Sequence, residues 1–429
     1  MKTALVLYQY FYPDDVVSAV HLTELSTGLS ARGWDVVAMP CNRGCREESR
    51  TYGSRDSVQG VTIRRVWRPR FRQSTNFGRI ANAIWMIAAW SFMAINPRIK
   101  CDVVIIGTDP ILSVVTAIAW RFARPRVRIA HWCFDLHPET AIADGILTDS
   151  SPAVRLVRGV LRRAYRCCDL IADIGGCMRQ KLSHYNHNAR TVTLPPWGLE
   201  EPRVPAPVPG AARESLFGDA RLGLLYSGSF GRAHTYSTLL QLAELVAADG
   251  VNLTFSVRGN REQALREAVG AGPRNAKMGG FVPQEQLAQQ LASADIHVVS
   301  LHEDWTGTVV PSKFFGALAI GRPVIFAGSS ESAIARWIAT HQVGWVLNAD
   351  TLSAVAAELR RLASDPADLK ILNAHCHRVY QENFSRATII RQWSDELGRL
   401  LPTHAAEYAL PSDSAGTTAL SCADVDRPS

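Results

Sequence analysis

Two short stretches of the sequence place a basic residue where a helix is expected to begin, an arrangement that suits phosphate groups. In SGSFGRAH (227–234), a strand ends in a loop that contains Gly228 and Gly231 and is followed by Arg232. Glycines let backbone N–H groups approach a phosphate, a helix N-terminus carries partial positive charge, and a guanidinium can bind two phosphate oxygens. The stretch predicts a phosphate site, and an ordinary turn with a surface arginine is the alternative.

The second stretch is VVPSKFFGALAIGRPVI (309–325), in which Pro311 and Ser312 would start a helix and Lys313 would lie in its first turn. A cation opposes the helix dipole there, because that end of a helix favours acidic groups. A bound anion would explain Lys313, and the alternative is a lysine stretched along an apolar surface. Together with Arg232, this residue indicates a diphosphate site in one domain.

Possible bases follow a buried strand in FDLHPE (134–139), which contains Asp135, His137 and Glu139. Ligands of parallel sheets bind beyond the carboxyl ends of the strands, and each of these side chains could serve as a base or accept a substrate hydrogen bond. A turn that uses Asp and Pro for its geometry is the alternative. His131, inside the strand, is expected to belong to the core.

Apolar strands that alternate with helices are expected to position these residues. Strand-like runs lie at 3–11, 34–40, 101–110, 127–135 and 168–175, and again at 222–231, 251–259, 295–301, 322–328 and 344–348. This pattern is typical of parallel sheets covered on both faces. Six prolines in 195–209 mark a linker, so we predict two Rossmann-like doubly wound domains facing across a cleft, 1–198 and 199–386, then a helix at 387–401 and a disordered tail at 403–429.

Charge is unevenly distributed along the 429 residues. Residues 1–198 hold 26 Lys and Arg against 15 Asp and Glu, so this half should seek an anionic partner. RRVWRPRFR (64–72) and VRLVRGVLRRAYR (154–166) combine arginines with apolar residues, which is typical of an anionic membrane surface. The predicted contact residues are Arg64, Arg65, Arg68, Arg70 and Trp85. Solvated basic faces are the alternative, and nucleic acid has no supporting motif.

Membrane-spanning, metal and secreted classes are not expected. The longest apolar candidate, Ile80 to Ile95, is shorter than a spanning helix and contains Asn82, so we expect an interfacial or buried helix. The nine Cys show no metal or redox spacing, and the first residues read as a strand rather than a signal peptide. A reducing compartment without a structural metal is the prediction.

The chain resembles a family 4 glycosyltransferase with the GT-B fold, in the WbuB- and WcaI-like branch that builds bacterial surface polysaccharides. The resemblance rests on HLTELSTGLSARGWDVV, FDLHPETAIADGIL, LPPWG, LLYSGSFGRAHTYSTLL, GGFVPQEQLAQQLASADIHVVSL and VVPSKFFGALAIGRPVI, and spans residues 1–400. It implies sugar transfer with retention from a UDP- or GDP-linked donor, without a metal or other cofactor. It also implies a lipid-linked glycan acceptor, and a peripheral location on the cytoplasmic face of the inner membrane.

The resemblance also implies a set of donor-binding residues, with Arg232 and Lys313 on the diphosphate. The set is Gly228, Gly231, Arg232, His234, Gly280, Phe281, Val282, Glu303, Thr306, Gly307, Thr308, Ser312 and Lys313. Asp135 and His137 would lie near the acceptor, and these two with Arg232 and Lys313 are the predicted catalytic residues. Many relatives carry two Glu in the donor site, whereas the matching positions here are Thr308 and Gly316.

Two other functions share this architecture. A nucleotide-sugar epimerase would need no membrane acceptor, so the basic apolar segment disfavours it. A non-catalytic, membrane-docked binder of nucleotide-sugars would explain the two missing acidic residues. A nicotinamide-dependent enzyme is disfavoured, because no G-x-G-x-x-G follows the first strand.

Overall fold

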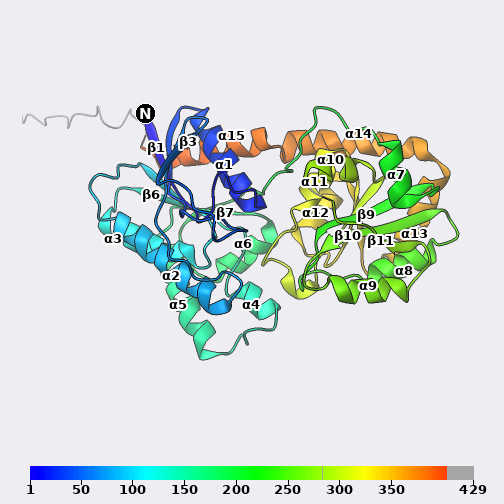
Figure 1. Ribbon diagram of the computed structural model, residues 1–429, viewed down its shortest axis with the longest axis horizontal. Helices are drawn as coiled ribbons and strands as arrows, with labels where there is room; N and C mark the ends of the chain where they lie inside the picture. The colour runs from blue at the N-terminus through cyan, green and yellow to red at the C-terminus, as the bar shows by residue number, and fades with distance from the viewer. Residues whose placement is uncertain (283, 403–429) are drawn as a thin grey trace, which may run out of the picture.

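The computed structural model describes residues 1–282 and 284–402, and Figure 1 shows two α/β domains joined side by side. The sheet of the N-terminal domain has the strand order β3-β4-β2-β1-β5-β6-β7-β8, and only β3 is antiparallel to its neighbour. Its strands are β1 (Lys2–Leu7), β2 (Trp34–Ala38), β3 (Arg55–Val58), β4 (Val61–Arg64), β5 (Val103–Ile106), β6 (Arg128–Trp132), β7 (Leu170–Asp173) and β8 (Arg190–Thr193). The predicted strands are present, and β3, β4 and β8 were not predicted.

The sheet of the C-terminal domain is entirely parallel, with the order β11-β10-β9-β12-β13-β14. Its strands are β9 (Leu222–Ser229), β10 (Val251–Arg258), β11 (Ala276–Met278), β12 (Ile296–Ser300), β13 (Val324–Ala327) and β14 (Gly344–Leu347). Strands β9, β12 and β13 are buried along most of their length, as continuous apolar runs between two helical layers require. The predicted fold class, two doubly wound α/β domains, is confirmed.

Helices cover both faces of the two sheets. The N-terminal domain contains α1 (Val17–Ser30), α2 (Asn76–Met93), α3 (Thr116–Ala123), α4 (Glu139–Ala143), α5 (Pro152–Arg166) and α6 (Gly176–Ser183), with a 3-10 turn η1 (Ser113–Val115). The C-terminal domain contains α7 (Gly210–Phe217), α8 (Ser237–Leu245), α9 (Glu262–Gly270), α10 (Gln284–Ala292), η2 (Glu303–Trp305), α11 (Lys313–Ala319), α12 (Ala333–His341) and α13 (Leu352–Ser364). None of the helices in the described ranges combines the length and hydropathy needed to cross a bilayer.

Two final helices join the domains along one edge of the molecule (Figure 1). Helix α14 (Pro366–Asn383) packs on α11 and α13, and α15 (Arg386–Leu400) packs on α1 of the N-terminal domain. Trp393 of α15 is fully buried and its ring lies 5.3 Å from that of Trp132. The ion pair between Arg190 and Glu396, 2.5 Å apart, fixes the same helix to β8. The predicted tail at 403–429 lies outside the described residues.

Replacing Trp393 with Ala should reduce the free energy of unfolding by about 3–5 kcal/mol, because a large buried side chain leaves a cavity. The matched control is Asp395→Ala on the exposed side of the same helix, which should change stability by less than about 0.5 kcal/mol. Urea denaturation followed by tryptophan fluorescence and circular dichroism measures both. Equal stability of the two variants would show that α15 does not hold the N-terminal domain together.

Candidate active site

A cleft of about 510 Å³ lies between the two domains. It is bordered by the amino end of α1, the segment 197–200, the carboxyl ends of β9 and β10, and the first turn of α11. Its lining includes Asp15, Val17, His21, Arg46, Trp197, Gly198, Leu199, Glu200, Gly228, Ser229, Arg258, Phe281, Val282, Ser312, Lys313 and Gly316. Five predicted donor-binding residues, Gly228, Phe281, Val282, Ser312 and Lys313, therefore line one cleft.

Lys313 is half-buried, and its side chain lines this cleft from the first turn of α11. Its Nζ donates a hydrogen bond to the Ser229 carbonyl at 3.0 Å and lies 5.4 Å from the ring centroid of Tyr226. Burial lowers the pKa of Lys313 to about 8. No carboxylate forms an ion pair with it among residues 1–282 and 284–402. Lys313 thus presents a poorly solvated positive charge to the cleft, where an anion would be strongly stabilised.

The absence of a side chain at Gly228 leaves room for the stem of Lys313. The φ of Gly228 is +109°, and a Cβ added there would lie 3.0 Å from Cε of Lys313. Any other residue would be strained and would crowd the lysine stem. At the opposite side of the lining, the Arg258 guanidinium stacks 4.4 Å from the ring centroid of Phe281, which gives the cleft a flat surface suited to an aromatic base.

Arg232 lies in a separate hollow of about 440 Å³, lined by residues that include Asp144, His234, Arg261, His302 and Trp305. Its guanidinium lies 3.3 Å from the Asp144 carboxylate, so this arginine bridges the two domains. His234 is half-buried and also lines the hollow. Burial, and then the nearby charge of Lys313, lower the pKa of His234 to about 4. Arg232 would have to leave Asp144 to reach an anion held by Lys313.

The loop 303–308 lies in the domain interface rather than in the cleft. The Leu136 N–H donates to the Thr308 carbonyl at 2.9 Å, and the Thr308 hydroxyl donates to the Trp305 carbonyl. Gly307, at φ +79°, packs against Cys177 of α6, whereas Glu303 is exposed in η2. The other predicted donor-binding glycines also lie outside the lining: Gly231 packs toward Asn260, and the Gly280 carbonyl accepts from Gln290.

The acidic groups of the N-terminal domain lie beside the ends of β5 and β6. Enclosure by surrounding protein raises the pKa of Asp135 to about 6, although this side chain remains accessible to solvent. Burial and the nearby charge of Asp135 raise the pKa of Asp109 to about 7. Burial also lowers the pKa of His137 to about 4, and its Nδ1 lies 2.5 Å from the Thr140 hydroxyl. A neutral imidazole and two weakly acidic carboxyl groups therefore lie near each other.

Glu139 has a structural role in the described part of the chain. Its carboxylate accepts a hydrogen bond from the Tyr185 hydroxyl at 2.7 Å and pairs with Arg158 at 3.1 Å. His131 is buried against the Ile106 carbonyl, as expected for a core residue.

Two residues of the predicted membrane surface are buried, so the prediction is wrong for them. Arg65 donates to the carbonyls of Tyr12 and Gly53 and to the Asp56 carboxylate. Arg68 is fully enclosed, with its guanidinium 5.9 Å from the ring centroid of Tyr10. Arg65 continues the alternation of β4, in which Val61 and Ile63 also point inward. Arg68 lies beyond the strand, where its N–H donates to the Asn42 side-chain oxygen at 2.9 Å. Arg64, Arg70 and Trp85 are exposed, as expected.

His21 and Arg258 of the cleft, and Asp109 beside Asp135, were not predicted. His21 Nε2 donates a hydrogen bond to the Trp197 carbonyl at 2.9 Å, and the His21 ring stacks on Phe134, so α1 connects the cleft with the 134–137 turn. Asp109 and Arg258 both lie at the carboxyl end of a buried strand, and this position alone could have identified them.

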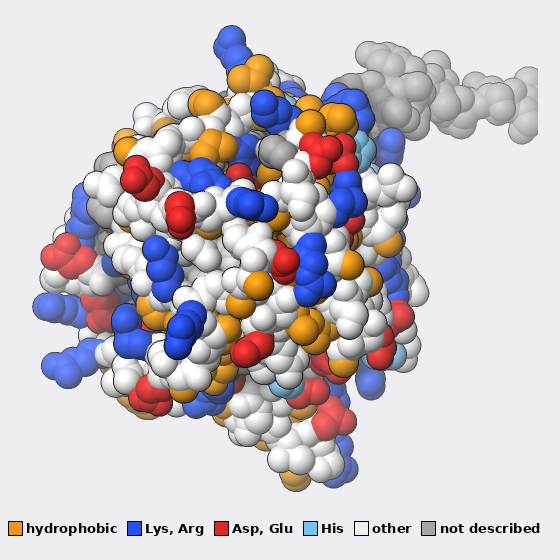
Figure 2. Space-filling model, turned by 90° about the vertical axis from the view of Figure 1, so that its right-hand side faces the viewer, with side chains coloured by type: hydrophobic (Ala, Val, Ile, Leu, Met, Phe, Trp, Pro, Cys, Tyr) orange, Lys and Arg blue, Asp and Glu red, His pale blue; other side chains and the backbone are white. Residues whose placement is uncertain are grey.

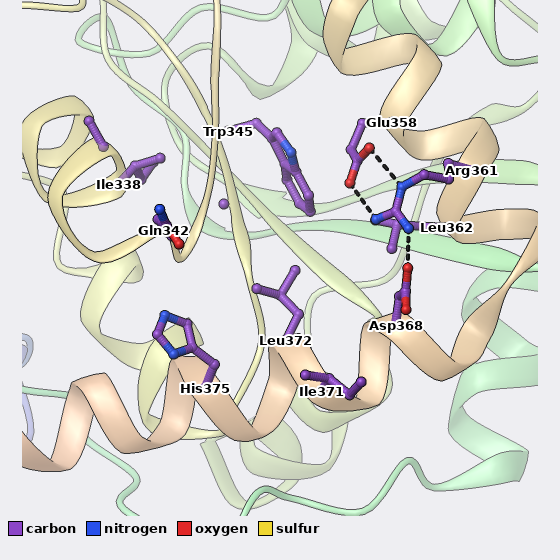
Figure 3. A pocket seen from close by; sticks show the side chains of 12 residues that line it. Ile338, Gln342, Trp345, Glu358, Arg361, Leu362, Asp368, Ile371, Leu372 and His375 are labelled. Atoms are coloured by element: carbon purple, nitrogen blue, oxygen red, sulfur yellow. Dashed lines mark hydrogen bonds and ion pairs between the residues drawn. The ribbon is translucent and has the colours of Figure 1, made fainter.

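A further hollow of about 550 Å³ lies on the outer side of the C-terminal domain, among α12, β14, α13 and α14 (Figure 3). Its cation, Arg361, pairs with Glu358 and Asp368. The charge in this hollow is already neutralised, which distinguishes it from the cleft around Lys313. Clusters of His, Cys, Asp or Glu suited to a metal ion are also absent from the described residues.

Comparison with known families matches both domains. The "Glycosyl transferase 4-like domain" model matches residues 18–197, and the "Glycosyl transferases group 1" model matches residues 221–365, so that together they cover about three quarters of the chain. The chain belongs to the family 4 glycosyltransferases. The cleft described above lies between the two matched regions of this glycosyltransferase.

Individual relatives are distant. The glycosyltransferase is 24% identical to "Probable glycosyltransferase WbjE" of Pseudomonas aeruginosa, over 74% of this chain and 79% of that protein. It is 29% identical to "Amylovoran biosynthesis glycosyltransferase AmsK" of Erwinia amylovora, over 33% of this chain and 35% of that protein.

Solved structures share the fold of the glycosyltransferase. A sucrose-phosphate synthase of Thermosynechococcus elongatus superimposes with a TM-score of 0.68 at 14% identity, covering 93% of this chain and 99% of that chain. Anabaena HepE in complex with UDP and glucose gives 0.62 at 12% identity, covering 93% and 100% of the two chains. WaaG, a glycosyltransferase involved in lipopolysaccharide biosynthesis, gives 0.59 at 17%, covering 92% and 99%.

The amine of Lys313 should titrate near pH 8, far below its ordinary pKa, because burial disfavours the charged form. Reductive methylation with ¹³C-formaldehyde followed by NMR through a pH series measures this, and the sequence has only six lysines to resolve. The Lys313→Arg variant identifies the signal by its loss. A midpoint near 10.5 would show that the group is well solvated.

Proposed function

We propose that this protein is a retaining glycosyltransferase that moves a sugar from a UDP- or GDP-linked donor to a lipid-linked glycan in surface polysaccharide biosynthesis. The observation that carries the proposal is the Lys313 ammonium, which faces the interdomain cleft and forms no ion pair within the described part of the chain. The names of the relatives support the pathway, since AmsK is an amylovoran biosynthesis enzyme. The UDP and UDP-glucose complexes of HepE support the class of donor.

In the proposed reaction, the bond between the sugar and the diphosphate breaks while negative charge accumulates on the leaving diphosphate. Lys313 and the backbone N–H groups beside Gly228 stabilise that charge, and Arg232 adds to this when it leaves Asp144. The protein's own cations would supply this stabilisation in place of a metal. Asp135, His137 and Asp109 lie at the strand ends of the opposite domain, where an acceptor hydroxyl would approach.

The acceptor side of the molecule has a surface suited to an anionic membrane. Helix α2 packs on α3 and α3 on α5, and Figure 1 shows the three together on the outer side of the N-terminal domain. Phe77 and Phe92 on α2, Phe122 on α3 and Leu156 on α5 are 75%, 72%, 92% and 72% exposed. Residues 64–100 contain no acidic residue, and six of their eight Lys and Arg, all but Arg65 and Arg68, are exposed. By contrast, the face of the C-terminal domain in Figure 2 has acidic and basic side chains interspersed.

A basic, aromatic and aliphatic surface of this kind inserts apolar side chains among lipid headgroups while arginines contact anionic phosphates. We therefore propose peripheral attachment to the cytoplasmic face of the inner membrane, with the N-terminal domain toward the lipid. A lipid-linked acceptor in that membrane would reach the acceptor domain directly.

The proposed transfer predicts that Lys313→Ala lowers kcat by about a hundredfold or more, since it removes the charge stabilisation in the transition state. Radiolabelled transfer from UDP- and GDP-sugars to membrane lipid extracts measures the activity. In the same assay, wild-type activity that persists in EDTA would show that the transfer needs no metal ion. Circular dichroism confirms folding of the variant, and NMR of the product determines the anomeric configuration. Unchanged turnover of Lys313→Ala would contradict the proposed role, and conversion of the donor without acceptor would indicate an epimerase.

The triple variant Phe77→Ser, Phe92→Ser, Phe122→Ser should bind phosphatidylglycerol-containing vesicles at least about tenfold more weakly, because it removes the inserting side chains. Ile371→Ser is the matched control, as Ile371 is 71% exposed on the C-terminal domain. Vesicle sedimentation compares both with wild type. Equal binding by all three proteins would place the membrane contact elsewhere.

A further inference from the structure

The cleft contains two acidic residues with different surroundings. Asp15 is paired with Arg46 at 3.2 Å, so its charge is compensated. Glu200 is exposed to the cleft, and within the described ranges its carboxylate has neither an ion pair nor a hydrogen-bond donor. The neighbouring Glu201 differs again, because it accepts from the Tyr380 hydroxyl and the Arg386 N–H outside the cleft lining. Glu200 is therefore the acidic group available to a ligand.

The interdomain segment holds Glu200 close to helix α11. Gly198 packs directly on that helix, since an added Cβ would lie 2.9 Å from Cβ of Ala319 and 3.3 Å from Cα of Gly316. Gly316 lies one turn after Lys313 and lines the same cleft as Glu200. A Cβ built on Gly316 meets nothing within 4 Å, so open space lies beside α11 at this position of the cleft lining.

A nucleotide could bind with its diphosphate at Lys313 and its base toward Phe281. Its ribose would then lie between these two residues, in the cleft that Glu200 also lines. A carboxylate has two oxygens that only accept hydrogen bonds, which suits a pair of vicinal hydroxyl groups. Helix α11 (KFFGALA) contains no acidic residue and has no side chain at Gly316, so it offers these hydroxyl groups no carboxylate.

We infer that Glu200 accepts hydrogen bonds from the ribose hydroxyls of the donor nucleotide, so that the interdomain segment supplies the carboxylate that α11 lacks. The inference rests on the proposed function, because it requires a nucleotide in this cleft. It adds a specificity residue on the segment that joins the two domains, and it makes recognition of the ribose dependent on the relative position of α11 and that segment.

Isothermal titration with UDP, GDP and their 2′,3′-dideoxy forms tests the inference. Wild type should bind the ribose forms about tenfold to a hundredfold more tightly, the range expected for hydrogen bonds to a charged group. Glu200→Ala should lose this preference while its affinity for the dideoxy forms stays the same or rises. Asp15→Asn is the control, since it removes a negative charge from the same cleft and should leave the ribose preference intact.

A second variant separates a lost contact from a distorted segment. Adding Gly316→Glu to Glu200→Ala should restore the ribose preference, because the space beside Gly316 accommodates a side chain. A ribose preference that persists in Glu200→Ala would overturn the inference, and so would its absence from wild type. A lost preference that Gly316→Glu does not restore would overturn the placement of the ribose between these positions. Failure of wild type to bind any nucleotide would instead overturn the proposed function itself.

Discussion

The constraint on which the site depends is the half-buried ammonium group of Lys313, which has no ion-pair partner among residues 1–282 and 284–402. At the start of α11 the Lys313 ammonium donates to the Ser229 carbonyl and lies over the face of Tyr226. A cation in this environment favours the arrival of an anion. The left-handed glycine at 228, the end of β9 and the first turn of α11 together produce this arrangement.

The domain interface determines how the two halves of such a site can meet. The Leu136 to Thr308 hydrogen bond and the Arg232 to Asp144 ion pair both cross between the domains, while α14 and α15 connect them along the far edge. In this conformation the Arg232 guanidinium is therefore paired with a carboxylate of the N-terminal domain. Rotation about the interdomain segment could release it toward the cleft, and the same movement would change the distance between Glu200 and α11.

The sequence was informative where one local pattern determines the structure. Continuous apolar strands alternating with helices were sufficient for the two parallel sheets, and the helix dipole singled out Lys313. The short strands β3, β4, β8 and β11, which lie at or next to the sheet edges, have no such pattern and were missed. Arg65 and Arg68 were misassigned because local composition does not reveal which face of an edge strand packs inward. Glu200 and His21 reach the cleft only through long-range packing, which no sequence window contains.

The central claim is that an anionic diphosphate binds at Lys313, and a crystal structure of the protein with a nucleoside diphosphate tests it most directly. The account predicts a phosphate oxygen about 3 Å from Nζ of Lys313, within hydrogen-bond distance. A diphosphate bound only in the hollow lined by Arg261 and His302, or beside Arg361 on the outer face, would contradict it.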